Sequence, residues 1–383
     1  MHQLNLSQLQ AIAHRQVEAT ADLTRRICEV PAPTGNEFER ARFIASLWRE
    51  RHYRPEIDEI GNVYTWRGKQ DSGPVILLLA HIDTVFPQNT PIYVTRDGDI
   101  LRGPGIGDNC VSVASLFSTF DILDELQLET PLPVIAVANV GEEGLGNLRG
   151  ARAAVERYRK RLGAVLVIDG NLGNITHRAV GSKRWRINVF GPGGHSFGDF
   201  GTPSAIHGLG RIIAAIADLD VPAEPRTTYN VGIIEGGTSV NTIAARASAI
   251  LDMRSTDVSA LNHLAKKVRA LIESRAGRGL RVEIEVLGER PAGERSQSDP
   301  LIKLAAKILT EQGIEPAFSS ASTDANIPIS LNIPSLCIGI TQGENAHTLE
   351  EFLHIPPIEE GLVQLVRLCL ESGKLFNSLT EGA

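Results

Sequence analysis

Histidines and carboxylates follow four apolar runs that lie far apart in the sequence. The runs and the residues after them are Val75–Ala80 with His81 and Asp83, Leu132–Val140 with Glu142 and Glu143, Ala164–Ile168 with Asp169, and Ser335–Ile340 with, after a short loop, His347. A further candidate, Asp108, follows the glycine-rich segment 103–107 and precedes a predicted helix. A buried strand does not need a charged residue at its end, so the repetition of this pattern indicates a chemical site.

Two histidines and three carboxylates suit a pair of zinc ions, because imidazole and carboxylate are ordinary zinc ligands. Each metal could take one histidine and one terminal carboxylate, with one carboxylate bridging and a position left open for water. Two metals about 3.5–4 Å apart can polarise a carbonyl and generate hydroxide together. The predicted chemistry is therefore hydrolysis of an unreactive bond such as an amide.

Two further details of spacing assign tasks within this set. Glu142 and Glu143 are adjacent, so their side chains should point in different directions. One of them can bind metal while the other faces the water as general base. Asp83 lies two residues beyond His81, on the same face of an extended segment, and could accept the second ring N–H of that histidine and fix its tautomer.

The elements that must position these residues alternate between apolar strands and helices. Helices are predicted at 5–30, from a capping box at Thr34 and Glu37 to about 53, at 112–127, 147–161, 298–312 and 357–373. This alternation is typical of an α/β domain with a largely parallel, buried sheet. Because ligands of such sheets bind at the carboxyl ends of the strands, the candidate residues should converge.

A different pattern occupies residues 184–294. Strands are expected at Trp185–Phe190, 228–235, 246–254 and 281–287, and helices at 203–219 and 257–275. The order β-α-β-β-α-β is that of a ferredoxin-like unit. The prediction is a discontinuous catalytic domain, residues 1–183 and 295–383, with an inserted domain at 184–294.

Composition narrows the class of protein. The chain has 383 residues, 42% of them hydrophobic, and a net charge of -7 without long charged runs, which argues against nucleic acid as a partner. The N-terminal segment lacks a signal pattern, and no run of 18 apolar residues predicts a membrane span. The cysteines (Cys28, Cys110, Cys337, Cys369) lie far apart, as expected of buried thiols in a cytoplasmic protein.

With these motifs in place, the sequence resembles a known family. The segments that carry the resemblance are His81-Ile-Asp83-Thr-Val, Gly105-Ile-Gly-Asp108-Asn, Gly141-Glu142-Glu143-Gly, Asp169-Gly, Gly193-Gly-His195-Ser and His347-Thr. In this order they look like the di-zinc exopeptidases, which include aminoacylase, peptidase T, glutamate carboxypeptidase and succinyl-diaminopimelate desuccinylase. The match covers almost the whole chain. It implies a mostly parallel, helix-flanked di-zinc α/β catalytic domain with an inserted ferredoxin-like α+β lid or dimerisation domain.

The resemblance implies a role for each residue at the metals. His81 and Asp169 would hold one zinc, Glu143 and His347 the other, with Asp108 bridging, Glu142 as general base and Asp83 orienting His81. Cobalt or manganese could replace zinc. It also implies a cis peptide bond between Asp108 and Asn109. The chain departs from many relatives directly afterwards, where Cys110 and Val111 stand, and packing is the favoured role for this thiol.

For the inserted domain, the resemblance implies a homodimer. His195 would stabilise the oxyanion, reaching into the active site of the partner. Asn241, Arg254 and Arg290 occupy positions that relatives use to hold the backbone and carboxylate of the substrate, and an arginine fork suits a carboxylate. For Arg254, a plain surface position on a strand is an equal alternative.

The predicted function is zinc-dependent hydrolysis of an amide bond in a di- or tripeptide, by attack of zinc-bound hydroxide. An N-acyl or N-carbamoyl amino acid amidohydrolase is the alternative within the hydrolases, because such enzymes can share every metal ligand. A non-catalytic binding protein on the same fold is the alternative from another class. The complete set of ligands and base argues against it.

Overall fold

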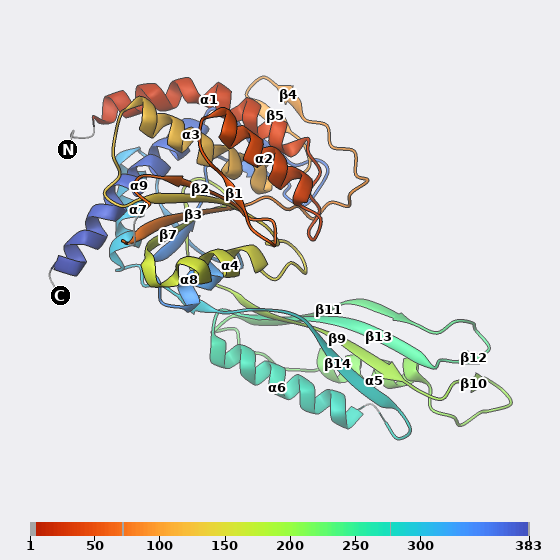
Figure 1. Cartoon of the computed structure of the whole chain (residues 1–383). Coiled ribbons are helices and arrows are strands. Elements are labelled where there is room, and N and C mark those ends of the chain that lie inside the picture. Colours follow the sequence, from red (N-terminus) through yellow and green to blue (C-terminus); the bar gives the residue numbers. More distant parts are fainter. Residues whose placement is uncertain (1–4, 71–72, 276, 382–383) are drawn as a thin grey trace. The chain divides into compact units, whose positions relative to one another are not determined.

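The computed structural model of the chain describes residues 5–70, 73–275 and 277–381 (Figure 1). The chain forms two compact units: unit 1 comprises residues 1–179 and 294–383, and unit 2 comprises Val180–Gly293. The sequence placed the inserted segment at 184–294. Its first strand, β9, already begins at Gly181.

A mostly parallel central sheet forms the middle layer of unit 1. Its strand order is β1 (Glu56–Ile57), β2 (Val63–Arg67), β6 (Val134–Asn139), β3 (Val75–His81), β7 (Leu162–Ile168), β17 (Ser335–Ile338), β8 (Asn174–Ala179) and the short β15 (Gly293–Glu294), with β16 (Ala317–Ala321) also paired to β8. The four strands from β6 to β17 run parallel, whereas β2 is antiparallel to β6, and β8 to β17. The predicted α/β fold with a mostly parallel sheet is therefore confirmed.

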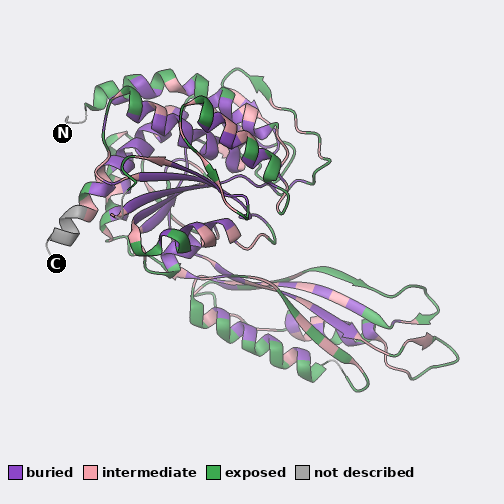
Figure 2. Ribbon diagram, viewed as in Figure 1, coloured by how far each residue is buried: buried purple, intermediate pink, exposed green. Residues whose placement is uncertain are grey.

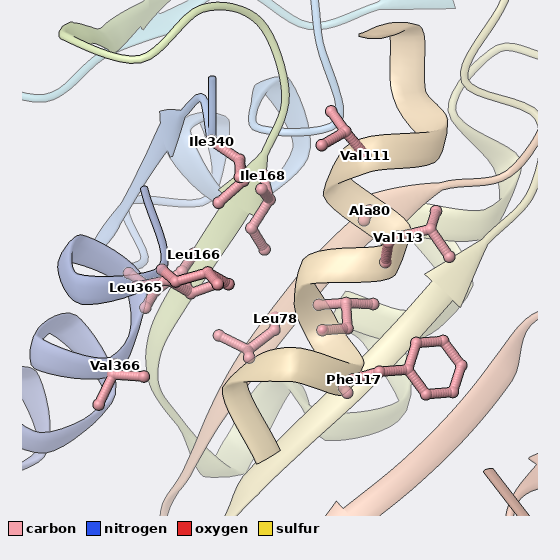
Figure 3. Close-up of a cluster of buried hydrophobic side chains, with 14 of the residues drawn as sticks. Leu78, Ala80, Val111, Val113, Phe117, Leu166, Ile168, Ile340, Leu365 and Val366 are labelled. Carbon is pink, nitrogen blue, oxygen red and sulfur yellow. The ribbon is translucent and has the colours of Figure 1, made fainter. Parts of the chain in front are cut away.

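Helices cover both faces of this sheet, which is why its strands are apolar on both sides (Figure 2). Successive residues of β3 point to opposite faces, so Leu78 and Ala80 join one buried cluster and Leu77 and Leu79 the other. The helices against the first cluster are α1 (Leu6–Cys28), α2 (Phe38–Glu50), α3 (Val111–Glu125), α7 (Pro300–Glu311) and α9 (Ile358–Glu381). Against the second cluster lie α4 (Arg149–Tyr158) and α8 (Asn326–Ser330). Figure 3 shows Phe117 of α3 and Leu166 of β7 in the first cluster.

One predicted helix start is wrong. Helix α2 begins at Phe38, its N-cap residue is Glu37, and no side chain caps it. The Thr34 hydroxyl donates instead to Asp83 Oδ2 at 2.9 Å. Glu37 accepts hydrogen bonds from the backbone N–H of Gly35 and from Arg149. Thr34 and Glu37 therefore stabilise a loop beside the strand ends and do not cap the start of α2.

Small elements complete unit 1. Strands β4 (Thr95–Asp97), β5 (Ile100–Arg102), β19 (Phe352–His354) and β18 (Gly343–Glu344) form a separate antiparallel sheet. A short π-helical segment, η1 (Ile106–Cys110), leads into α3. No helix among the residues that the structure describes is long and apolar enough to cross a membrane.

Unit 2 is an antiparallel sheet packed against two helices. Its strand order is β11 (Thr227–Gly236), β13 (Arg246–Ser255), β9 (Gly181–Phe190) and β14 (Arg281–Arg290). Helices α5 (Ala205–Ala217) and α6 (Val258–Arg275) bury their apolar sides against it, with Trp185 and Leu251 in the shared core. A short hairpin pairs β10 (Gly194–His195) with β12 (Thr242–Ile243). The order of elements is the predicted ferredoxin-like one.

Candidate metal centre

The ends of three neighbouring strands bring most of the candidate residues together. His81 is the last residue of β3, Glu142 and Glu143 follow β6, and Asp169 follows β7 directly. Because β6, β3 and β7 are adjacent and parallel, their carboxyl ends meet at one edge of the sheet. His347 lies near this edge on the loop between β18 and β19, and Asp108 lies near it on η1.

Asp108 lies between the two histidines. Its Oδ1 is 3.1 Å from His81 Nε2, and its Oδ2 is 3.0 Å from His347 Nε2. His347 Nε2 is also 3.0 Å from Glu143 Oε1. The potential ligand atoms form triads within 4.8 Å of one another, namely His81 with Asp108 and Asp169, and Asp108 with Glu143 and His347. The two oxygens of one carboxylate thus serve two triads.

The residues fit a pair of divalent metal ions. His81 Nε2 is buried and makes no hydrogen bond, although the carboxylate of Asp108 is close. Because Nδ1 of His81 lies against the main-chain oxygen of Asp83, Nε2 is the nitrogen left to bind a cation. The donors are imidazole nitrogens and carboxylate oxygens, the set that suits zinc and related metals. Glu142 forms a further cluster with His81 and Glu143.

The electrostatics of the cluster point the same way. Burial raises the pKa of Glu143 to about 7, with Asp108 adding to the shift, and burial holds the pKa of Asp169 well above its usual range. A hydrogen bond with Asp108 raises the pKa of His347 to about 9. Burial lowers the pKa of His81, but its contacts with Asp108 and Asp83 outweigh this and hold it well above the usual value. Without a cation, the cluster can relieve its buried charge only by holding protons.

Asp83 holds the loop that carries both glutamates. Its Oδ1 accepts the backbone N–H of Glu142 at 3.0 Å, and its Oδ2 accepts that of Glu143 at 2.9 Å. Towards His81 the closest oxygen is the main-chain one, 3.1 Å from Nδ1, while the carboxylate is 3.7 Å away. Asp83 is fully buried. The atom nearest to His81 Nδ1 is thus the main-chain oxygen of Asp83 rather than the carboxylate that the sequence predicted. The carboxylate instead fixes the Glu142–Glu143 loop, which the sequence did not predict.

Replacing Asp83 by asparagine is expected to lower both stability and activity. The amide nitrogen cannot accept a hydrogen bond, so one of the two loop N–H groups loses its acceptor. An unsatisfied buried donor costs on the order of 1–3 kcal/mol, measurable as a lower urea midpoint. The same change at Asp97, an exposed residue of β4, is the control and should be neutral. Equal urea midpoints for the two variants would contradict the role given to Asp83.

The peptide bond between Asp108 and Asn109 is cis, as the resemblance implied. The side chain of Asn109 donates from Nδ2 to the backbone oxygen of Ile168 at 2.9 Å. This bond ties η1 to the end of β7, next to Asp169. The segment with Asp108 is thus connected to β7, which Asp169 of the same triad follows directly.

In unit 2, His195 and Asn241 lie close together. β10 and β12 pair His195 with Thr242, and Ser196 N donates to Asn241 O at 3.0 Å. His195 is exposed, and its Nδ1 accepts the backbone N–H groups of Phe197 and Gly198. An Nδ1 that accepts leaves the ring proton on Nε2. His195 therefore presents an N–H donor to the solvent.

The two predicted arginines lie at the other end of the unit 2 sheet. Arg254 of β13 and Arg290 of β14 both pair with Ser182, near the start of β9, whereas His195 follows the end of that strand. β9 has 10 residues and spans about 33 Å at 3.3 Å per residue. Arg254 donates to Asp252 at 2.7 Å, and Arg290 is buried. The structure brings His195 and Asn241 together but separates them from both arginines.

The structure adds contacts around the site that the sequence did not predict. Glu351 accepts three backbone N–H groups of the Asp108 loop, and burial raises its pKa to about 7. Asn171 exchanges two side-chain hydrogen bonds with the backbone of Gly343, at 3.1 and 2.9 Å, so it ties the Asp169 loop to the His347 loop. Asp324 is buried and accepts from Asn139 at 2.6 Å. Burial raises the pKa of Asp324 to about 7, and Glu142 adds to the shift.

A cavity of about 300 Å³ within unit 1 is lined by two of the candidate ligands, Asp108 and Asp169. Asn171, Glu344 and Phe352 also line it. A space of this size beside two potential metal ligands can take part of a small substrate.

The family comparison agrees with this geometry. A family model described as "Peptidase family M20/M25/M40" matches residues 77–371. The matched range contains every residue of both triads, together with Glu142 and the whole of unit 2.

Individual relatives include both peptidases and an enzyme that acts on an acylated amino acid. The succinyl-diaminopimelate desuccinylase of Methylorubrum extorquens is 25% identical over 372 residues, which cover 88% of this chain and 94% of that protein. The aminopeptidase PepT of Bacillus cereus has a solved structure with a TM-score of 0.74 at 21% identity, covering 94% of this chain and 99% of that one. The YxeP protein of Bacillus subtilis, described as a dinuclear metal-binding peptidase, has a TM-score of 0.68 at 18% identity, covering 94% and 99% of the two chains. At this identity the solved structures show the same fold.

Proposed function

This chain belongs to peptidase family M20/M25/M40, and we propose that it is a two-metal hydrolase that cleaves an amide bond in a di- or tripeptide. The observation that carries the proposal is the position of Asp108. One carboxylate places one oxygen near His81 and the other near His347, as a bridge between two metals requires. A single metal would need only one of these oxygens.

His81 and Asp169 would hold one ion and Glu143 and His347 the other, with Asp108 between them. We propose zinc as the metal, with cobalt or manganese as possible substitutes, because the donor set suits all three. The dinuclear site named for the Bacillus subtilis YxeP protein supports the number of metals. When bound, such ions lower the pKa of a water molecule and polarise the scissile carbonyl.

The residues around the ions would move protons and hold the substrate. Glu142, beside His81 and Glu143, would take a proton from the attacking water and deliver it to the leaving nitrogen. Asp83 holds Glu142 in place through its backbone N–H. His195 would donate its Nε2–H to the oxygen that becomes negative in the transition state. Asn241, Arg254 and Arg290 would bind the backbone and carboxylate of the substrate. Because Asn241 lies far from both arginines within one unit 2, we propose that Asn241 and the arginines serve one substrate from different subunits of a dimer.

A substrate panel tests the proposal and separates it from its alternatives. The metal-loaded protein is incubated with di- and tripeptides, N-acyl and N-carbamoyl amino acids, and the released products are identified by mass spectrometry. Cleavage of peptides supports the proposal, whereas cleavage of only the acylated amino acids favours the alternative amidohydrolase, as the desuccinylase relative would suggest. Binding of a panel member without cleavage would favour a non-catalytic binding protein.

We also propose that the protein works as a homodimer in the cytoplasm, without a nucleic acid partner. Strand β11 is at the end of the unit 2 sheet, and Ile233 and Ile234 on it are 51% and 61% exposed. An apolar edge strand is a surface that a second copy can cover. The four cysteines are buried and unbridged, and the net charge of -7 disfavours nucleic acid.

The dimer proposal predicts complementation between two inactive variants. His195→Ala is expected to lower turnover by about 10²–10³-fold, the effect typical of an oxyanion donor. If His195 serves the active site of the partner, a mixed dimer of His195→Ala and Glu142→Gln contains one intact site. Random mixing should then restore roughly a quarter of wild-type activity.

The measurement is the rate of hydrolysis before and after the two purified variants are mixed and allowed to exchange subunits. His207→Ala, a histidine of α5 in the same unit, is the matched control for the loss of an imidazole. Failure of the mixture to regain activity, although mixed dimers are detected by native mass spectrometry, would contradict the reach of His195 across the dimer.

A further inference from the structure

Glu351 lies against the loop that presents Asp108. Its Oε2 accepts the backbone N–H of Gly105 at 2.8 Å, and its Oε1 accepts those of Gly107 and Asp108 at 2.8 and 2.7 Å. The main-chain oxygen of Glu351 accepts a fourth N–H from the same loop, that of Gly103, at 2.9 Å. One residue thus receives four hydrogen bonds from six consecutive positions, residues 103–108.

These N–H groups converge because the loop is rich in glycine. Gly105 has φ +80°, a conformation that L side chains rarely adopt. A Cβ atom on Gly107 would come within 3.2 Å of Glu351 Oε1, so a side chain there would press on the carboxylate. Converging backbone N–H groups form an anion-binding concavity, and here the anion comes from the chain itself.

Glu351 also belongs to the segment that carries His347, which forms a triad with Asp108 and Glu143. It follows His347 by four positions, and the turn between them is closed by the hydrogen bond from Glu351 N to Thr348 O. Glu351 is 2% exposed, and the hydrogen-bond partners of its carboxylate among the described residues are backbone N–H groups rather than a cation. Burying a carboxylate without a cationic partner costs free energy unless hydrogen bonds offset it. Here the backbone N–H groups of the Asp108 loop provide those hydrogen bonds.

We propose that Glu351 is a positioning residue, which holds Asp108 so that its two carboxylate oxygens face the two metal ions. The inference rests on the proposed two-metal function. The carboxylate of Glu351 contacts one residue of the triads, Asp108, and it does so through the backbone N–H of Asp108. It connects the Asp108 loop to the His347 segment, so both triads depend on one buried carboxylate.

The first test is Glu351→Gln, compared with Glu350→Gln at the exposed neighbouring position. An amide offers one oxygen, so its nitrogen must face at least one of the three N–H donors. Loss of an outer hydrogen bond to a metal ligand typically weakens metal binding by about 10–100-fold. We expect that loss for Glu351→Gln and a changed absorption spectrum of the cobalt-loaded protein, with Glu350→Gln unchanged in both. Metal affinity is measured by competition with a chromogenic chelator.

The second test is rescue of Glu351→Ala by formate. The cavity of about 300 Å³ is lined by Glu351, Gly107 and Asp108, so a small carboxylate can reach the vacated N–H groups. Formate is expected to restore metal affinity of Glu351→Ala in proportion to its concentration and to have no such effect on wild type. Acetate, which is larger, should rescue less.

The outcomes separate the inference from the proposed function. Wild-type protein that binds two metals and hydrolyses peptides, together with a Glu351→Gln variant of equal metal affinity and equal cobalt spectrum, would overturn the inference alone. Wild-type protein that binds no metal would overturn the proposed function first. If Glu351→Ala does not fold, the glutamine variant still decides the question, since its side chain has the same shape.

Discussion

Glu142→Gln is expected to bind both metals and to turn over substrate about 10²–10⁴-fold more slowly than wild type. Glutamine keeps the shape of the side chain and removes its ability to take a proton. The loop itself should not move, because Asp83 holds it through backbone N–H groups that the substitution leaves in place. KM should change little, since the loss falls on a step after binding.

The measurement is a comparison of turnover and metal content for Glu142→Gln and Glu350→Gln. The control has the same chemical change at an exposed glutamate and should match wild type. Near-normal turnover in a fully metal-loaded Glu142→Gln variant would rule out Glu142 as the general base. Loss of metal from that variant would instead point to Glu142 as a ligand.

Substitution of Asp108 is expected to have the largest effect of any single change on metal binding. Asp108→Ala removes a donor from both triads, so both ions should be lost and activity should fall below detection. Asp169→Ala and Glu143→Ala each remove a donor from one triad only. Each of these variants is expected to bind about one equivalent of metal tightly. Activity should fall by more than about 100-fold, because loss of a residue that only supports a metal ligand already lowers activity by up to about that factor.

Metal content after dialysis, determined by elemental analysis, distinguishes these cases. We expect nearly no metal in Asp108→Ala and about one equivalent in each of the other two variants. Circular dichroism in the presence of metal checks that all three are folded. An Asp108→Ala variant that keeps one tightly bound ion, like the other two, would show that this carboxylate does not bridge.

The residues at strand ends could be predicted from the sequence because their position follows from a general rule. The runs that end at His81, before Glu142 and before Asp169 are continuous and apolar, as strands buried on both faces must be. Once the sheet is parallel, its carboxyl ends share one edge, whatever the order of the strands. The observed neighbours β6, β3 and β7 place these three loops side by side.

The roles of two candidate residues depended on the family resemblance. Asp108 and His347 were candidates from their places in the sequence, but they lie on irregular segments, η1 and the loop after β18, whose geometry no periodicity predicts. The cis peptide after Asp108 likewise came from the resemblance. Spacing alone left open which carboxylate bridges.

Two of the errors and omissions come from hydrogen bonds between residues that lie far apart in the sequence. The motif at Thr34 and Glu37 has the sequence of a capping box, but the Thr34 hydroxyl bonds to Asp83, 49 positions away. Glu351 gives no signal in the sequence, because its partners are backbone N–H groups 243 to 246 positions earlier. Strand β16 was not predicted, since its residues Ser319 and Ser320 give no apolar pattern.

Activity during removal and return of metal is the most direct test of the central claim. The protein is stripped with a chelator, and zinc is added back stepwise while hydrolysis of the preferred peptide is followed. We expect no cleavage by the stripped protein and a return of activity that is complete at about two equivalents of metal. Unchanged cleavage by protein shown to be free of metal would contradict a two-metal hydrolase.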